Sequence, residues 1–129
     1  NFFLSPVELD RKLYPSVEHA YQAAKTKDKN ARKKIQKMTA NAARLYGQTV
    51  PLVEKWDHLR IPMMRSLCKQ KFIKHKDLQI KLREIGDAEL IEGNDYGDSF
   101  WGVCNNIGEN HLGKILMDIR NDFKIFYWS

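Results

Sequence analysis

Apolar side chains recur at helical spacing along most of this chain. In the first clear segment, four of them fall at positions i, i+3, i+4 and i+7 and would form one buried stripe: Val17, Ala20, Tyr21 and Ala24. Pro15 and Ser16 stand just before this stripe, as proline and serine commonly do where a helix begins. We therefore expect a helix from about Pro15 to Lys27.

The same spacing is clearest near the end of the chain. Six apolar residues keep it over four turns: Leu112, Ile115, Leu116, Ile119, Phe123 and Phe126. Pro62 indicates that one helix ends before it and that another starts there. The remaining expected helices are about Ala31–Lys37, 40–46 with Thr39 as N-cap and Gly47 as stop, and Asp77–Ile85.

Alternating patterns that would indicate strands are scarce. Residues 1–13 are typical of extended or turn structure, with a short edge strand expected near Val7. A second short strand is expected at Glu89–Ile91. We find no repeat, low-complexity tract or linker. The pattern predicts a mainly α fold, a single compact helical domain over residues 1–129 with little or no β structure.

Length and composition fit that prediction. A chain of 129 residues with 43% apolar content can bury one core. Its longest apolar run falls short of the roughly 18 residues of a membrane span. Cys68 and Cys104 are isolated, which is typical of a reducing compartment, so we expect a cytoplasmic protein. The chain opens on Asn1 rather than methionine, and we expect that its extreme N-terminal residues are missing.

The net charge of +6 is concentrated in one run. Seven cations and a single acid, Asp28, stand between residues 25 and 37: Lys25, Lys27, Lys29, Arg32, Lys33, Lys34 and Lys37. Such a run can hold phosphate or nucleic acid, but it is also typical of a solvated helix face. No aromatic residue interleaves it, so it does not predict a stacking platform for single strands.

Glycine is concentrated near the C-terminal end. Six of the seven glycines lie between Gly86 and Gly113, where unusual backbone angles are expected. Residues 94–102, NDYGDSFWG, combine two carboxylates with three aromatic side chains. This composition suits a ligand-binding loop and equally suits ordinary turns.

Metal and nucleotide motifs are absent from the sequence. The four histidines have no paired metal-ligand spacing, and neither GxGxxG nor GxxxxGK[ST] occurs. We therefore expect neither a metal nor a cofactor. The conspicuous acid is Glu18, beside His19 in the first turn of the first helix, where it serves either as an ordinary helix-start acid or in chemistry.

Three segments resemble a known family. They are NFFLSPVELDRKLYPSVEHAYQAAK at the start, WDHLRIPMMRSLCKQKF in the middle and DSFWGVCNNIGENHLGKILMDIR near the end. Together they are similar, in order and spacing, to the signatures of the NADAR superfamily, also called the YbiA-like family. The resemblance covers nearly the whole chain.

The resemblance implies an α-helical N-glycosidase that handles ribosides, ADP-ribose or NAD-related ligands. Some members hydrolyse phosphoribosylamino-pyrimidine intermediates of riboflavin synthesis, and others remove ADP-ribose from guanine in DNA. The family's important acid falls on Glu18, its tryptophan on Trp56 and its second acid on Asp98. Other recurring positions of the family are matched by Asn1, Gln22, Lys25, Trp101, Asn110, Gly113 and Arg120.

The chemistry of N-glycoside cleavage suits these residues. A ribose C1′–N bond breaks through an oxocarbenium-like state that a carboxylate stabilises, and a second carboxylate roughly 6.5–9.5 Å away leaves room for the attacking water. We take Glu18 and Asp98 as the catalytic pair. Helical spacing puts Glu18, Gln22 and Lys25 on one face, where they offer an acid, an amide and a cation to a phosphorylated riboside.

The other candidates are predicted to bind substrate, and each also has a structural interpretation. Trp56 and Trp101 would stack on a base or fill the core, and Asn110 would bind ligand or cap the last helix. Arg120 would bind an anion or brace loops. His19 is expected to be structural, with a role as general acid as the alternative. The rival hypotheses for the whole chain are a non-catalytic module that binds ADP-ribose or NAD, and a DNA-binding protein that uses the basic run.

Overall fold

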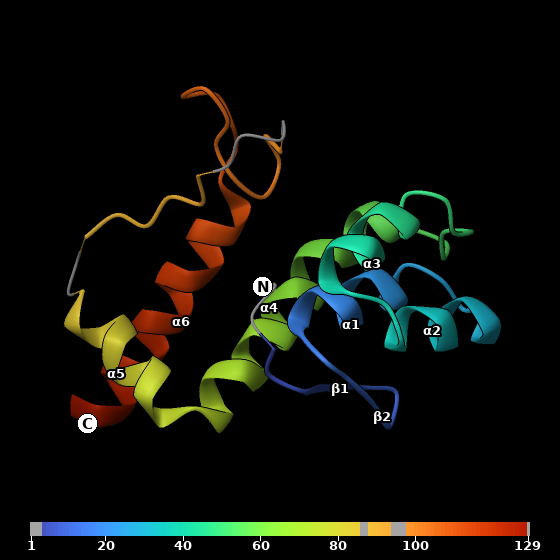
Figure 1. Cartoon of the computed structure of the whole chain (residues 1–129). Coiled ribbons are helices and arrows are strands. Elements are labelled where there is room, and N and C mark those ends of the chain that lie inside the picture. The colour runs from blue at the N-terminus through green and yellow to red at the C-terminus, as the bar shows by residue number, and fades with distance from the viewer. Residues whose placement is uncertain (1–3, 86–87, 94–97, 129) are drawn as a thin grey trace. The chain divides into compact units, whose positions relative to one another are not determined.

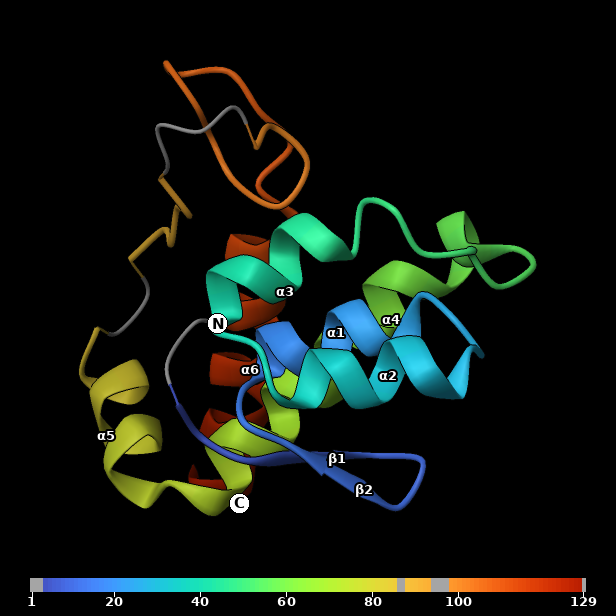
Figure 2. The same cartoon turned by 45° about the vertical axis from the view of Figure 1, so that its right-hand side comes forward.

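The computed structural model describes residues 4–85, 88–93 and 98–128, without the side chains of 124–128. In these residues the chain forms one short hairpin and six helices (Figures 1 and 2), which confirms the mainly α prediction. The elements are β1 Val7–Leu9, β2 Lys12–Tyr14, α1 Val17–Ala24, α2 Lys29–Gln36, α3 Ala40–Tyr46, α4 Trp56–Lys74, α5 Lys76–Glu84 and α6 His111–Trp128.

The chain divides into two compact units, Asn1–Lys71 and Phe72–Ser129. Whether the two together make the single domain predicted from the sequence stays a prediction.

The hairpin opens the first unit. Val7 pairs with Tyr14 and Leu9 with Lys12 in an antiparallel register. The two residues between the strands, Asp10 and Arg11, both have positive φ, as a tight two-residue turn requires. The extended structure expected near Val7 is confirmed, whereas its partner β2 was not predicted, because the turn contains no glycine and the strand is only three residues long.

Helix α1 is the centre of the first unit. All eight of its residues are buried, and it packs against α2, α3 and both strands. Small side chains such as Ala20, Ala23 and Ala24 permit this close packing. The helix begins at Ser16, whose hydroxyl accepts a hydrogen bond from the amide of His19 at 3.2 Å. It ends at Ala24, three residues before the expected end, and the backbone turns there through Lys25 and Thr26.

Two further helix starts follow the same rule. Asp28 caps α2 by accepting from the amides of Asn30 and Ala31, and Thr39 caps α3 by accepting from Ala42. Thr39 and Gly47 therefore flank α3 as predicted from the sequence.

The expectation of two helices meeting at Pro62 is wrong. Helix α4 runs through Pro62 without interruption from Trp56 to Lys74. Proline removes one amide donor, which leaves the carbonyl four residues earlier, at His58, without its usual partner. Both residues lie on the exposed side of the helix, where water can satisfy that carbonyl.

The second unit is built on α5 and α6, which pack together. The apolar stripe of α6 is buried at Leu112, Ile115, Ile119 and Phe123, as predicted. Leu116 is only half-buried, and Phe126 lies outside the described side chains. Residues 89–91 do not form the expected strand; the neighbouring Gly93 makes only an isolated bridge with Val103. Too few consecutive residues pair there to build a ladder.

The loop before α6 carries the unusual backbone angles predicted for it. Only Gly108 among the described glycines has positive φ there, and Asn105, Asn106 and Asn110 supply the others. Asparagine enters this region more readily than most residues other than glycine, because its side chain is short and polar. Among the described helices, none has an apolar stretch suited to a bilayer.

Candidate active site

Glu18 is a buried carboxylate in the first turn of α1, with 8% of its surface exposed. Its Oε1 accepts a hydrogen bond from Gln22 Nε2 at 2.7 Å. No described residue donates to Oε2. The N-cap of α1 is Ser16, which accepts a hydrogen bond from the amide of His19, so Glu18 does not act as a cap. The simple interpretation as a hydrogen-bonding helix-start acid therefore does not account for its position.

Burial and charge act against each other at Glu18. Burial raises the pKa of the Glu18 carboxyl, while the Gln22 hydrogen bond and the charges of Lys25 and Arg44 oppose that rise. Burial likewise lowers the pKa of Lys25, and the charge of Glu18 opposes that fall. Glu18 and Lys25 thus each stabilise the charged form of the other in surroundings that are poorly solvated.

Gln22 is held between Glu18 and the end of α3. It is 4% exposed, and its Oε1 has no donor among the described residues. A Cβ on Gly47 would collide with this oxygen, so the close approach depends on glycine at that position. From the sequence, Gly47 was interpreted only as a helix stop. Its second role could not be seen without knowing that α1 and α3 pack together.

Lys25 and two aromatic rings continue the same face. Lys25 Nζ lies 5.6 Å from the centroid of the Tyr21 ring and 3.5 Å from the carbonyl oxygen of Gly47. The rings of Tyr21 and Trp56 are 5.4 Å apart between centroids, at 54°. Lys25 therefore carries its charge over an aromatic surface that Trp56 extends.

Trp56 also borders a cavity of about 370 Å³ in the first unit. Its walls are largely apolar and also include four charged residues: Leu9, Asp10, Ala24, Lys27, Arg32, Val53, Glu54, Trp56, Leu59 and Met63. The indole is only 7% exposed, so it serves the core as well as the cavity wall. Its burial fits the core interpretation, and its contact with a base stays a prediction.

His19 has a structural role. Its Nε2 lies 2.7 Å from the carbonyl oxygen of Met38 and therefore donates to it, while Nδ1 lies 2.6 Å from Ser16 Oγ. Both ring nitrogens are thus used inside the fold. The ring ties the start of α1 to the segment before α3, as the structural interpretation expected.

Asp98 lies in the loop of the second unit. Its Oδ1 accepts from the amides of Phe100 at 3.1 Å and Trp101 at 2.9 Å, which closes a turn. This is the structural interpretation that the sequence left open for the loop. The catalytic role of Asp98 stays a prediction.

The turn set by Asp98 places three rings together. Phe100 lies edge-on to Trp101 at 4.8 Å and against His111 at 4.4 Å, between ring centroids. The carbonyls of Phe100 and Trp101 accept from the amides of His111 and Leu112. The loop therefore satisfies the first amides of α6 with its own backbone. Trp101 is half-buried, so part of its surface remains for a ligand.

Asn110 fastens the segment before the loop. Its Oδ1 accepts from the amide of Glu92 and its Nδ2 donates to the carbonyl of Leu90, each at 2.8 Å. A Cβ on Gly113 would collide with Leu90 and with this amide. Asn110 precedes α6 but bonds across to residues 90–92, so the interpretation as a cap is replaced by that of a bridge.

Arg120 is a buried cation on α6, 4% exposed. Its Nη1 donates to the carbonyl of Ala88 at 2.7 Å, and its Nε meets no acceptor in the described ranges. The contact with Ala88 fits the predicted bracing of a loop. The unused Nε is compatible with the predicted contact to an anion.

The structure thus brings together one part of the predicted site. Glu18, Gln22, Lys25 and Trp56 gather in the first unit around α1. The second unit holds Asp98, Trp101, Asn110 and Arg120, and Asn1 lies outside the described residues. No group of three histidine, cysteine or acidic side chains suited to a metal occurs within residues 4–85, 88–93 and 98–128.

Comparison with known proteins identifies the class. The model of the NADAR domain family matches residues 2–124, and the chain belongs to this family. It is 33% identical over 129 residues to the N-glycosidase YbiA of Shigella sonnei, covering 97% of this chain and 80% of that protein. It is 32% identical to the riboflavin biosynthesis protein VVA0006 of Vibrio vulnificus, covering 96% of this chain and 35% of that longer protein.

A solved structure has the same fold. The NMR structure of the Escherichia coli protein YbiA matches with a TM-score of 0.88 at 30% identity, over 100% of this chain and 79% of that one. The family resemblance noted in the sequence is therefore confirmed.

Proposed function

We propose that this protein is an N-glycosidase that hydrolyses the ribose C1′–N bond of a phosphorylated or ADP-ribosylated N-riboside. The observation that carries the proposal is Glu18, a buried carboxylate that no helix amide requires and whose Oε2 has no donor in the described part of the chain. Family membership and the N-glycosidase name of the Shigella relative support the same reaction.

In this mechanism Glu18 faces the sugar. As the C1′–N bond lengthens, positive charge grows on the ribose, and a carboxylate in poorly solvated surroundings stabilises it more strongly than water would. The Gln22 hydrogen bond to Oε1 fixes the plane of the carboxylate, so that Oε2 is directed at the substrate. The same oxygen then orients or deprotonates the attacking water.

Lys25 and Trp56 hold the substrate's two ends. Lys25 is only partly buried and carries a point charge suited to phosphate. Trp56 offers an aromatic edge for the base or for the apolar face of the ribose. Asp98, Trp101, Asn110, Arg120 and Asn1 remain in the proposed site through the family resemblance.

Two substrate classes fit this site. One is ADP-ribosyl-guanine in DNA, and the other is a ribosylamino-pyrimidine of riboflavin synthesis, the pathway named for the Vibrio relative. We favour the ADP-ribosyl class because the positive charge of the chain is large and gathers beside α1. The two free cysteines fit a protein of the cytoplasm.

The test is a substrate panel with two proteins, the parent and Glu18→Gln. Each is incubated with ADP-ribosylated oligonucleotide, NAD and a phosphoribosylamino-pyrimidine, and the released base is measured by mass spectrometry. We expect release from at least one substrate by the parent and none by the variant. If the parent binds ADP-ribose but releases no base from any substrate, the protein is a binding module and the proposal is wrong.

A further inference from the structure

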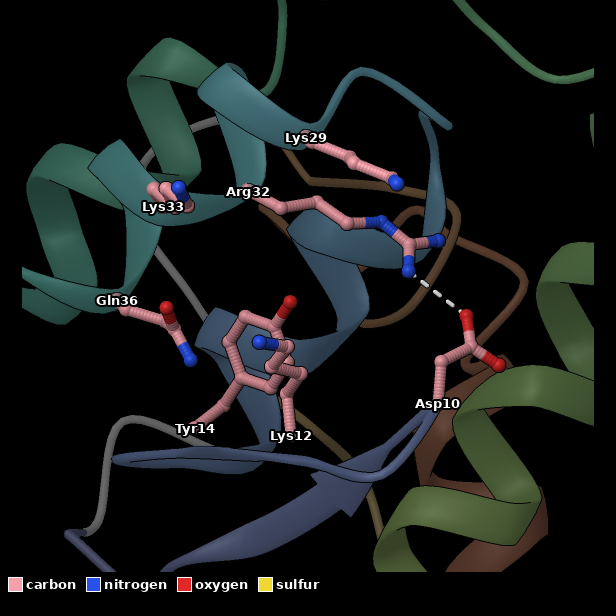
Figure 3. A pocket seen from close by; sticks show the side chains of 7 residues that line it. All are labelled: Asp10, Lys12, Tyr14, Lys29, Arg32, Lys33 and Gln36. Carbon is pink, nitrogen blue, oxygen red and sulfur yellow. Dashed lines mark hydrogen bonds and ion pairs between the residues drawn. The ribbon is translucent and has the colours of Figure 1, made fainter.

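A second cavity, of about 400 Å³, lies in the first unit between the hairpin and α2. Its walls come from the turn of the hairpin, from β2 and from one face of α2 (Figure 3). We call it the hairpin cleft, and it is lined by Asp10, Lys12, Tyr14, Lys29, Arg32, Lys33 and Gln36. Glu18 is not among these residues.

The hairpin cleft is braced on both sides. Arg32 Nη1 donates to Asp10 Oδ2 at 2.7 Å, and Gln36 Nε2 donates to the carbonyl of Leu13 at 3.0 Å. Arg32 Nε also donates to the carbonyls of Ala23 and Thr26 at the end of α1. The hairpin is thereby tied to α2 at two points one helical turn apart, so the cleft exists before any ligand enters.

The charge in the cleft is unbalanced. Lys12, Lys29 and Lys33 make no ion pair or hydrogen bond with any described residue. The only acid in its lining is Asp10, and Asp10 is already paired with Arg32, which lowers the pKa of its carboxyl. Helical spacing sets Lys29, Arg32 and Lys33 on one face of α2, opposite Lys12 on the hairpin.

Tyr14 gives an independent indication of a ligand. The residue is 2% exposed, yet its hydroxyl has no hydrogen-bond partner among the described residues. Figure 3 shows this hydroxyl pointing toward α2 inside the cleft. Burial raises the pKa of Tyr14, so the phenol keeps its proton and can donate it to an anion. The rest of the ring is packed in the fold, so the hydroxyl is the part of Tyr14 that is available to a group bound in the cleft.

From these observations we infer that the hairpin cleft is a phosphate-binding site, in which Tyr14 donates a hydrogen bond and Lys12, Lys29 and Lys33 supply charge. The Nη2 group of Arg32, which bonds to no described residue, would add a further donor. The phosphate group is either that of a free nucleotide or the phosphodiester of a nucleic-acid strand. The inference does not depend on the proposed reaction at Glu18.

The hairpin cleft divides the basic run into two groups. Lys29, Arg32 and Lys33 line the cleft, whereas Lys34 and Lys37 do not. Lys29 and Lys33 are exposed like Lys34 and Lys37, so what sets them apart is the side of α2 that they occupy. We expect only the cleft residues to matter for phosphate.

The experiment compares two probes and matched variants. A labelled single-stranded oligonucleotide is followed by fluorescence anisotropy, and pyrophosphate by calorimetry, each across a salt titration. The cleft variant is Lys12→Gln with Lys33→Gln. The control is Lys76→Gln with Lys81→Gln. These two lysines are exposed on α5, and their substitution removes the same amount of charge as the cleft variant does.

We expect the cleft variant to bind at least about tenfold more weakly, since a hydrogen bond to a charged group is worth about 1.5–3 kcal/mol. For the oligonucleotide, the slope of log K against log salt should also fall by about 1.4, or about 0.7 for each lost contact. The control should bind like the parent. Whichever probe binds more tightly identifies the source of the phosphate.

The variant Tyr14→Phe distinguishes a specific phosphate site from non-specific electrostatic attraction to the lysines. It removes one hydroxyl and no charge, so binding should weaken about three- to tenfold while the salt slope stays unchanged. A urea titration checks that the variant keeps its fold. The inference is overturned if neither probe binds the parent, if the control loses as much as the cleft variant, or if Tyr14→Phe binds like the parent.

Discussion

The first turn of α1 and the loop before α6 each carry a carboxylate that the sequence places in a catalytic role, and the two are held in different ways. Glu18 accepts one bond from a side chain and none from the described backbone. Asp98 accepts two backbone amides on one oxygen. Glu18 is buried with a raised pKa, whereas Asp98 is half-buried and shapes a turn.

This difference shows how a catalytic carboxylate can be distinguished from a structural one. Asp28 and Thr39 cap their helices as acids and hydroxyls ordinarily do. At α1 the cap is Ser16, so the fold gains no backbone hydrogen bond from Glu18 and still buries its charge. Burying a charge costs stability. A group that costs stability without a structural return is a strong functional candidate.

The largest expected effect is on turnover in Glu18→Gln. The change keeps the size of the side chain and its acceptor oxygen for Gln22, and it removes the charge that stabilises the sugar cation. We expect kcat to fall about 10²–10⁴-fold, as for loss of a general acid–base group, with ligand affinity close to that of the parent. Steady-state kinetics and calorimetry measure the two quantities. Full turnover by the variant would leave Glu18 with no chemical role.

The next largest effect is expected from the residues that position Glu18, namely Gln22 and Gly47, rather than from Glu18 itself. In Gly47→Ala the new Cβ would collide with Gln22 Oε1 and move the amide away from Glu18. We expect about a tenfold loss of kcat and a loss of about 1–3 kcal/mol in the free energy of unfolding, as for other overpacked sites. Kinetics and urea unfolding measure these losses.

Gly93→Ala is the matched control for this change. A Cβ at Gly93 would meet nothing within 4 Å. Its activity and stability should stay at parental values. An active Gly47→Ala protein would show that the contact between Gln22 and Gly47 does not position Glu18.

Helical periodicity was sufficient to predict most of the helices. The buried stripes of α1 and α6 and the cap of α3 follow from local spacing and capping chemistry, which the sequence displays directly. The continuous α4 was missed because a proline on an exposed helix face costs less than one in a buried position. The strand expected at 89–91 was wrong because strand formation depends on a partner, which local sequence does not specify.

The site was predictable in part for the same reason. Glu18, Gln22 and Lys25 share a face because they share a helix, so spacing alone grouped them. Gly47 contacts Gln22 across two packed helices, and Tyr14 faces α2 across the hairpin cleft. Such contacts depend on tertiary packing between segments that are distant in the sequence.

A smaller effect is expected at Asp98, where two substitutions separate the possible roles. Asp98→Asn keeps an oxygen for the amides of Phe100 and Trp101, whereas Asp98→Ala leaves both without an acceptor. If the turn is the main role, Asp98→Asn keeps kcat within about threefold of the parent and Asp98→Ala loses about 1–3 kcal/mol of stability. We expect this outcome from the hydrogen bonds. A kcat loss in Asp98→Asn as large as that in Glu18→Gln would establish the catalytic pair predicted from the sequence.

The smallest expected effect is on stability, and it has the opposite sign to the effect on turnover. Because burial raises the pKa of Glu18, the folded state holds the carboxyl proton more tightly than the unfolded state does. The stability associated with the protonated acid is full at low pH and is lost as the pH rises through the folded-state pKa. Glutamine mimics the neutral acid at every pH. Glu18→Gln should therefore unfold at a higher temperature than the parent at neutral pH, and the two melting temperatures should converge as the pH falls below the ordinary range of a glutamate. Calorimetric melting across this pH range measures the difference, with Glu8→Gln, an exposed position on β1, as the control that should show no such trend. Equal melting temperatures at neutral pH would mean that the surrounding cations and Gln22 fully offset the cost of burial, and the contrast between the two carboxylates would then rest on geometry alone.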